Sequence, residues 1–210
     1  MIQATGAQAI VRLLERQEIR TIAGIPGGAN LPIYDALSQS RQIRHVLARQ
    51  EQAAGFIAQG MARTTGRPGV CFATSGPGAT NMLTAVADAK LDSVPLVCIT
   101  GQVPRGMIGT DAFQEVDTYG LSIPITKHNF LVRSAGELLQ VVPEAFRIAT
   151  SGRPGPVWID VPKDVQNETV EFDAWPEPGR PEAPPATDAA ECQRAAAMIN
   201  AARRPVLYLG

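Results

Sequence analysis

The chain has 210 residues, of which 45% are hydrophobic, and a formal net charge of −1. This length suits one domain with a sizeable core plus part of a second, and the near-zero charge gives no indication of a nucleic-acid or anionic membrane partner. The longest apolar runs have the length of strands and are too short to span a membrane, and the first residues lack the basic flank and apolar centre of a signal peptide.

Helical and strand patterns alternate along the chain. Thr5 can cap a helix that carries Ile10 and Leu14 on one face. Further helices are predicted over residues 31–40, 52–65, 79–90 and 137–150, and strands over 21–24, 43–48, 69–73, 95–100 and 156–161. Strands separated by helices of this length predict an α/β fold, a doubly wound parallel sheet of about six strands with helices on both faces.

The composition changes after residue 166. Residues 167–187 are rich in Pro, Glu and Ala, and because proline fixes φ and removes a backbone donor, they predict an extended linker. A proline-rich ligand for a partner domain is the alternative. Residues 188–202 predict an Ala-rich amphipathic helix, and residues 204–210 begin a strand. We therefore expect a domain over 1–166, a linker over 167–187 and the start of a truncated second domain over 188–210.

The three cysteines, Cys71, Cys98 and Cys192, are odd in number, and the first two fall inside predicted buried strands. This pattern is typical of small core residues in a reducing cytoplasm, and it favours neither a disulfide framework nor a metal site.

Glu51 lies where an apolar strand ends and a helical segment begins, between two glycine loops, GIPGGAN (24–30) and TSGPGATN (74–81). A carboxylate between two strand-to-helix turns suggests an acid–base group beside a bound cofactor. The alternative is an ordinary acid in the first turn of a helix, where negative charge suits the dipole. A dinucleotide-binding fingerprint is absent, because no G-x-G-x-x-G is followed by a ribose-binding acid.

Seven motifs occur in one order: GIPGGANLPIYDAL, LARQEQAAGFIAQGMAR, ATSGPGATN, DSVPLVCITGQVP, IGTDAFQEVD, ITKHNFLV and SGRPGPVWIDVPKDV. Together they resemble the N-terminal, pyrimidine-binding domain of the thiamine diphosphate enzymes. Within that superfamily the chain is most similar to the catalytic large subunits of acetolactate synthases, over roughly residues 5–165.

The resemblance implies a fragment of a thiamine diphosphate-dependent carboligase. Such an enzyme decarboxylates pyruvate and joins the two-carbon unit to a second 2-oxoacid, pyruvate or 2-oxobutyrate, in branched-chain amino acid biosynthesis. It also implies Mg²⁺, held through a C-terminal domain, and FAD, held mainly through a middle domain. Homodimers or homotetramers are expected in the cytoplasm, with a small regulatory subunit where one is present. Without the other domains, the fragment is expected to be inactive.

Site roles follow from the same resemblance. Glu51 is expected to be catalytic: its carboxyl hydrogen-bonds N1′ of the cofactor's aminopyrimidine and promotes loss of the C2 proton. The other expected cofactor contacts are Gly28, Ser93, Gln114, Lys127 and Arg153, the last of them to FAD. The expected substrate-pocket residues are Gly27, Phe113 and Lys163.

Several of these residues have plainer alternatives. The paired glycines can serve a tight turn of positive φ, Phe113 and Gln114 can be ordinary loop packing, and Lys163 can be a solvated lysine. Ser93 can be a simple hydroxyl at a helix end. His128, next to Lys127, can be a surface residue or a core residue whose hydrogen bonds are satisfied.

Gln50 departs from the family pattern, which usually has His immediately before the glutamate. Glutamine donates and accepts hydrogen bonds but does not titrate near neutral pH. The departure therefore bears on efficiency or on the pH profile, and not on activation of the cofactor by Glu51.

Two other functions compete with acetolactate synthesis. One is that of another thiamine diphosphate-dependent 2-oxoacid decarboxylase or oxidase, since these enzymes share the fold. Glyoxylate carboligase is disfavoured because it lacks the glutamate that Glu51 represents here. The other is a non-catalytic module that dimerises or binds partners.

Overall fold

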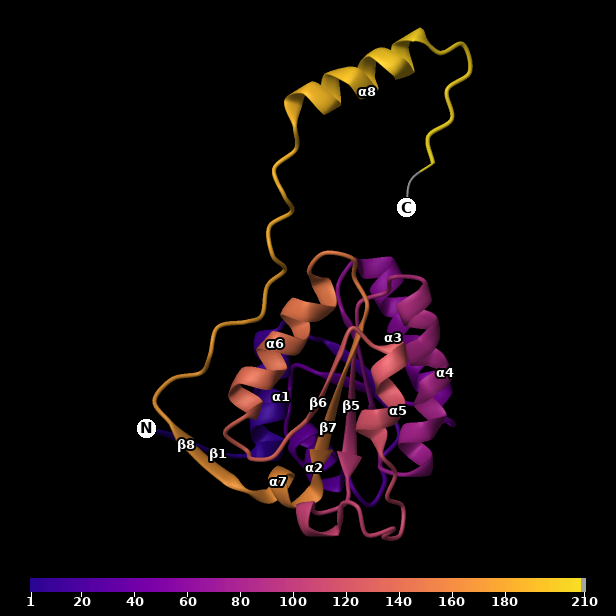
Figure 1. The fold of residues 1–210 in the computed structure, drawn as a ribbon. Coiled ribbons are helices and arrows are strands. Elements are labelled where there is room, and N and C mark those ends of the chain that lie inside the picture. Colours follow the sequence, from indigo (N-terminus) through magenta and orange to yellow (C-terminus); the bar gives the residue numbers. More distant parts are fainter. Residues whose placement is uncertain (209–210) are drawn as a thin grey trace.

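The computed structural model describes residues 1–208, and its centre is one sheet of six parallel strands in the order β3-β2-β4-β5-β7-β6 (Figure 1). The strands are β2 (Thr21–Gly24), β3 (Arg44–Leu47), β4 (Gly69–Ala73), β5 (Leu96–Gln102), β6 (His128–Leu131) and β7 (Pro156–Pro162). The prediction of a parallel sheet of about six strands is confirmed.

Helices cover both faces of the sheet, as predicted (Figure 1). One face packs against α1 (Gly6–Arg16), α2 (Leu31–Ser38) and α6 (Leu138–Thr150). The other packs against α3 (Glu51–Thr65), α4 (Pro77–Leu91) and the short α5 (Thr118–Ser122).

Strand side chains alternate between the two cores. In β4, Val70 and Phe72 belong to the core under α1 and α6, whereas Cys71 and Ala73 belong to the core under α4. Because both faces are buried, a strand of this kind has a continuous apolar sequence.

The first helix begins as the sequence predicts. The Gln8 backbone N–H donates to Thr5 Oγ1 at 3.2 Å, and the Thr5 N–H donates to Gln8 Oε1 at 2.9 Å. This reciprocal pair is a capping box, and it satisfies two backbone donors that the first turn would otherwise leave free.

A small antiparallel pair lies beside the main sheet, formed by β1 (Ile2–Thr5) and β8 (Thr169–Phe172). The sequence did not predict it, and β8 falls within the predicted linker. Beyond β8 the chain stays against the domain: the Glu182 N–H donates to Ser151 Oγ at 2.9 Å, and Gly179 approaches the Pro143 backbone too closely for a Cβ. The first part of the extended segment is therefore docked on the domain.

The helix predicted over 188–202 is α8 (Ala189–Ala201), whose residues are all exposed and which lies away from the sheet in Figure 1. Residues 205–208 form no strand, contrary to the strand predicted over 204–210, and Leu209 and Gly210 lie outside the described residues. The remaining elements are short: the 3-10 turns η1 (Arg105–Met107) and η2 (Ile123–Ile125), and α7 (Lys163–Asn167). None of the described helices is both long and apolar enough to cross a membrane.

Candidate active site

Glu51 is the first residue of α3, just beyond the carboxyl end of β3. Gln50, which precedes it, has extended backbone geometry, and its side chain accepts a hydrogen bond from the Ala53 N–H at 3.0 Å. Gln50 is therefore the N-cap of α3. The half-buried Glu51 carboxylate lies at the positive end of the helix dipole, where negative charge is stabilised.

One oxygen of this carboxylate has a side-chain partner. Asn81 Nδ2, on α4, donates to Glu51 Oε2 at 2.8 Å. A Cβ placed on Gly78, in the first turn of α4, would lie 3.5 Å from Glu51 Oε1. The first turns of α3 and α4 thus face each other at the carboxyl edge of the sheet.

The upstream glycine loop closes on the same place through Thr74, which follows β4. The Ala29 N–H donates to Thr74 Oγ1 at 3.1 Å, and the Gly27 N–H donates to Asn30 Oδ1 at 2.7 Å. A Cβ on Gly27 would lie 2.6 Å from Thr74 Cβ, whereas one on Gly28 would meet no atom within 4 Å. Neither glycine has positive φ. Gly27 is therefore required by this close approach, and Gly28 leaves its backbone uncovered.

The loop carrying Phe113 and Gln114 reaches this edge through Gly76. Gly76 has φ +56°, and a Cβ there would lie 2.6 Å from the Gln114 carbonyl oxygen. The loop is closed by Glu115, whose carboxylate accepts hydrogen bonds from the N–H groups of Gly109, Thr110 and Ala112; the bond from Gly109 is the largest cause of its lowered pKa. Phe113 is 86% exposed.

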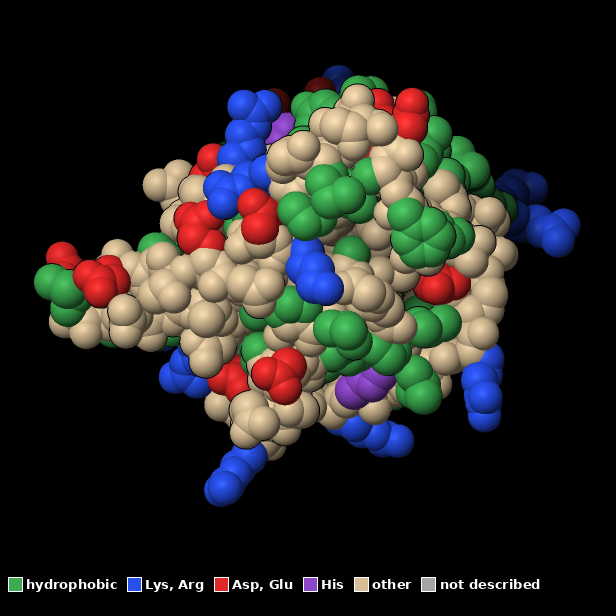
Figure 2. Space-filling view, turned by 90° about the horizontal axis from the view of Figure 1, so that it is seen from below, with side chains coloured by type: hydrophobic (Ala, Val, Ile, Leu, Met, Phe, Trp, Pro, Cys, Tyr) green, Lys and Arg blue, Asp and Glu red, His purple; other side chains and the backbone are tan. Residues whose placement is uncertain are grey.

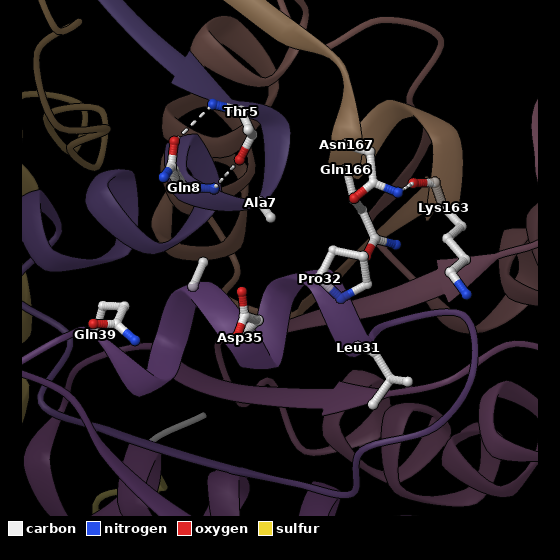
Figure 3. Close-up of a pocket in the computed structure, with 11 residues that line it drawn as sticks. Thr5, Ala7, Gln8, Leu31, Pro32, Asp35, Gln39, Lys163, Gln166 and Asn167 are labelled. Atoms are coloured by element: carbon white, nitrogen blue, oxygen red, sulfur yellow. Dashed lines mark hydrogen bonds between the residues drawn. The ribbon is translucent and has the colours of Figure 1, made fainter.

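Lys163 begins α7 at the carboxyl end of β7. It lines a cavity of about 520 Å³ between α1, α2 and α7, and its side chain lies well apart from that of Asp35 (Figure 3). The buried Gln166 Nε2 donates to the Ala29 carbonyl at 2.7 Å, so α7 is fastened to the loop that contains Gly27 and Gly28.

Ser93, Lys127 and Arg153 lie in turns that precede β5, β6 and β7, at the opposite edge of the parallel sheet. Arg153 Nε donates to Ser93 Oγ at 2.7 Å, and Lys127 Nζ donates to the Ser151 carbonyl at 2.7 Å. Burial, followed by the charges of Lys90 and Arg147, lowers the pKa of Lys127. Lys127 and Arg153 line a cavity of about 360 Å³ with Lys90, and no acidic side chain of residues 1–208 lines it.

The predicted residues thus form two groups in this chain. Gly27, Gly28, Glu51, Lys163 and the Phe113–Gln114 pair lie at the carboxyl edge, which Figure 2 views directly, with hydrophobic side chains gathered over it. The lysine, serine and arginine of the other edge do not join them. His128 is exposed, which agrees with the surface alternative. Within residues 1–208 no group of three or more His, Cys, Asp or Glu side chains could hold a metal ion.

Comparison with known families decides the identity of this domain. The model of the thiamine pyrophosphate enzyme N-terminal TPP binding domain matches residues 4–121, more than half of the chain. The chain belongs to this family.

Curated relatives extend the likeness over nearly the whole chain. The large subunit of acetolactate synthase isozyme 1 of Escherichia coli (strain K12) is 68% identical over 206 residues, which cover 98% of this chain and 37% of that protein. An acetolactate synthase of Mycobacterium bovis is 56% identical, over 99% of this chain and 34% of its own length. The chloroplastic acetolactate synthase 3 of Brassica napus is 50% identical, over 98% and 32%. The chain therefore spans about a third of the length of these relatives.

Within this thiamine pyrophosphate-binding domain, sequence reasoning missed two side chains, one in contact with Glu51 and one in contact with the glycines around it. Asn81 closes the TSGPGATN motif, and its amide contacts the carboxylate; Thr74 opens the motif and packs against Gly27 and Gly78. The available signal for Asn81 was a polar side chain in the second turn of a helix that starts at a glycine loop. Residues 74–81 were interpreted as one loop, which gave this side chain no role of its own.

Proposed function

We propose that this chain is the N-terminal, pyrimidine-binding part of an acetolactate synthase large subunit. The complete enzyme would condense pyruvate with pyruvate or 2-oxobutyrate in the synthesis of valine, leucine and isoleucine. The support is the 50–68% identity to acetolactate synthases over 98% or more of this chain. The single structural observation that carries the proposal is the Glu51 carboxylate, held at the sheet edge beside uncovered glycine backbone.

The residues at this edge fit the aminopyrimidine of thiamine diphosphate. Gly28 has open space where a side chain would be, and Glu51 Oε1, beside Gly78, accepts no hydrogen bond from the described residues, so we expect a flat ring to approach both. The chemistry supplied by bound thiamine diphosphate is a nucleophilic carbon that adds to the carbonyl of a 2-oxoacid and accepts the electrons left by decarboxylation.

The role proposed for Glu51 is to share a proton with a ring nitrogen of the pyrimidine. A carboxyl in hydrogen-bond reach of the acceptor can act as a general acid–base group. Gln50 takes no part in proton transfer, because its amide does not titrate and already caps α3. Gln114 and Phe113 would close the pocket from the neighbouring loop, and Gly27 and Lys163 would border the path of the substrate.

The remaining cofactor contacts are proposed to need the rest of the protein. Mg²⁺ and the diphosphate would be held by a C-terminal domain. FAD would be held mainly by a middle domain, with Arg153 as its contact from this chain. The Arg153 guanidinium is already oriented by Ser93 Oγ and by the Leu91 carbonyl, and such a planar donor group suits phosphate oxygens. Lys127 and Ser93 are proposed to support the same edge.

We propose domain limits of 1–166, 167–187 for the linker and 188–210 for the start of the middle domain. We also propose a homodimer or homotetramer in the cytoplasm, with a regulatory subunit as the printed name "large subunit" of one relative suggests. Exposed apolar side chains around the site support pairing; they are Leu47, Phe56, Ile57 and Phe113. The free cysteines Cys71 and Cys98 support a reducing compartment.

Product analysis of the full-length protein tests the proposal. Two molecules of pyruvate should give one acetolactate and one CO₂, dependent on thiamine diphosphate and Mg²⁺. Acetaldehyde in place of acetolactate would identify a decarboxylase, and hydrogen peroxide an oxidase, and either result would overturn the proposed synthesis. No CO₂ release from any 2-oxoacid would overturn the enzymatic role. The 210-residue chain alone should form no acetolactate.

A further inference from the structure

Asn81 has no evident packing role. It is exposed on α4, whereas its neighbour Met82 is buried in the core between α4 and the sheet. Its one side-chain hydrogen bond among the described residues is the 2.8 Å contact with Glu51 Oε2, from a position 30 residues along the chain. Truncating this side chain should therefore leave the core unchanged.

The two oxygens of Glu51 have different surroundings. Oε2 accepts the Asn81 hydrogen bond. Oε1 accepts none from residues 1–208 and lies beside Gly78, whose missing Cβ would stand 2.7 Å from the Thr74 methyl group and 3.5 Å from Oε1. A Cβ at position 78 would therefore clash with Thr74 and stand in van der Waals contact with Oε1, so glycine leaves more room beside this oxygen.

The Asn81 amide can determine which of the two Glu51 oxygens carries a proton. The Asn NH₂ group only donates, and a carboxylate oxygen is a better acceptor than the hydroxyl oxygen of a protonated carboxyl. We propose that Asn81 is a positioning residue, which holds Oε2 as an acceptor and thereby makes Oε1 the oxygen that shares a proton with the cofactor. This inference rests on the proposed function, because it assigns roles to the two oxygens of the same catalytic carboxyl.

Two variants of the full-length protein separate the hydrogen bond from the shape of the side chain. Asn81→Ala removes the donor, and Asn81→Asp keeps the shape but replaces the donor by a second carboxylate. Thr84→Ala is the matched control, because Thr84 is exposed on α4 one turn further on and forms no side-chain hydrogen bond in the described chain.

The measurement is hydrogen–deuterium exchange at C2 of bound thiamine diphosphate, together with the dissociation constant of the cofactor from calorimetry. Asn81→Ala should slow exchange roughly tenfold, the lower end expected for a charge-assisted hydrogen bond between partly exposed groups. The dissociation constant should change by no more than about threefold, because Asn81 acts through Glu51 and not on the cofactor. Thr84→Ala should match the wild type in both quantities.

Asn81→Asp adds a pH signature that a purely structural role would not give. Two adjacent carboxylates repel, so exchange should be slower than in Asn81→Ala at neutral pH. It should recover as the pH falls, because the new carboxyl, once protonated, can again donate to Oε2. Tyr34 of α2 is a titratable neighbour of Glu51; burial, then Cys71 and Glu51, raise its pKa, so it stays protonated in this range.

Wild-type exchange rates in both Asn81 variants, or an equal loss in Thr84→Ala, would overturn the positioning role. Failure of the proposed function is a different result: the wild-type protein itself would then neither bind thiamine diphosphate nor accelerate C2 exchange.

Discussion

The stability of this domain should depend on pH through Asp160, which lies on β7 and is 2% exposed. Its carboxylate accepts hydrogen bonds from Thr100 Oγ1 at 2.6 Å and from Gln102 Nε2 at 2.9 Å, and Trp158 Nε1 donates to the same Thr100 oxygen at 2.8 Å. Burial outweighs these hydrogen bonds and raises the pKa of Asp160 to about 7, against 3.8 for a solvated aspartate.

The direction in which stability changes with pH follows from the raised pKa of Asp160. Between pH 3.8 and about 7 the folded chain holds a proton that the unfolded chain has released. The contribution of Asp160 to stability is therefore fully present below the lower value and is lost as pH rises through the upper one. With ~1.4 kcal/mol for each pKa unit, the free energy of unfolding should fall on the order of 4 kcal/mol across this window.

The variant Asp160→Asn tests this account, because asparagine stays neutral at every pH. Its amide has nearly the size of the carboxyl group, and the amide oxygen can still accept a hydrogen bond from Gln102 Nε2. Urea unfolding at about pH 4 compares two neutral side chains and so reports the packing change alone. At about pH 8 the free energy of unfolding of the variant, relative to that of the wild type, should be higher than at pH 4 by on the order of 4 kcal/mol. A difference that is the same at both pH values would refute the reasoning.

Four further substitutions, at Gly76, Gly60 and Gln50, test the backbone that supports the site. Gly76→Ala, which meets both a positive φ of +56° and the Gln114 carbonyl oxygen at 2.6 Å, should destabilise the chain by about 2–4 kcal/mol in urea unfolding. The control is Gly60→Ala, on the exposed face of α3, where a Cβ would meet no atom within 4 Å; it should stabilise the chain by ~0.5–1 kcal/mol. Changes of the same sign in the stabilities of the Gly76 and Gly60 variants would contradict the account. Gln50→Ala removes the N-cap of α3 and should lower the free energy of unfolding by ~1 kcal/mol, whereas aspartate in Gln50→Asp is a better N-cap and should restore it. Equal stabilities of the wild type and both variants would show that the cap is not formed in solution.

The main sheet was predictable because its signals are local. The continuous apolar run of β4 and the helices that separate the strands can be recognised without knowing the partners. The five strands predicted within residues 1–166 all lie in the six-stranded sheet, whereas the strand predicted over 204–210 does not form over residues 205–208. β6 was missed because two of its four residues, His128 and Asn129, are polar; Asn129 is nevertheless buried, through hydrogen bonds to the Tyr119 carbonyl and Ser122 Oγ. A polar residue that is satisfied by a neighbouring helix gives no strand signal in the sequence.

The sequence also failed to predict pairing between segments that are far apart along the chain. β1 and β8 join the two ends of the domain, with Ile2 opposite Phe172, and neither four-residue segment has enough apolar residues to be recognised alone. For the same reason the proline-rich segment looked like a free linker, although Gly179 and Glu182 contact the domain.

The position of Glu51 could be predicted, but its partner could not. A strand-to-helix junction in a parallel sheet places the residue at the carboxyl edge, where ligands bind in such folds. Which amide reaches it depends on how α3 packs against α4, and that is a tertiary property. The resemblance likewise suggested roles for Ser93, Lys127 and Arg153 but did not reveal that they lie at the opposite edge of the sheet.

The most direct test of the central claim is hydrogen–deuterium exchange at C2 of thiamine diphosphate bound to the full-length Glu51→Gln variant. Glutamine keeps the size of the side chain and can still accept from Asn81, but it has no ionisable proton. The exchange rate should fall by ~10²–10⁴, the range typical for loss of a general acid–base group. Exchange at the wild-type rate, in a variant that still binds the cofactor, would contradict the assignment of Glu51 as its activator.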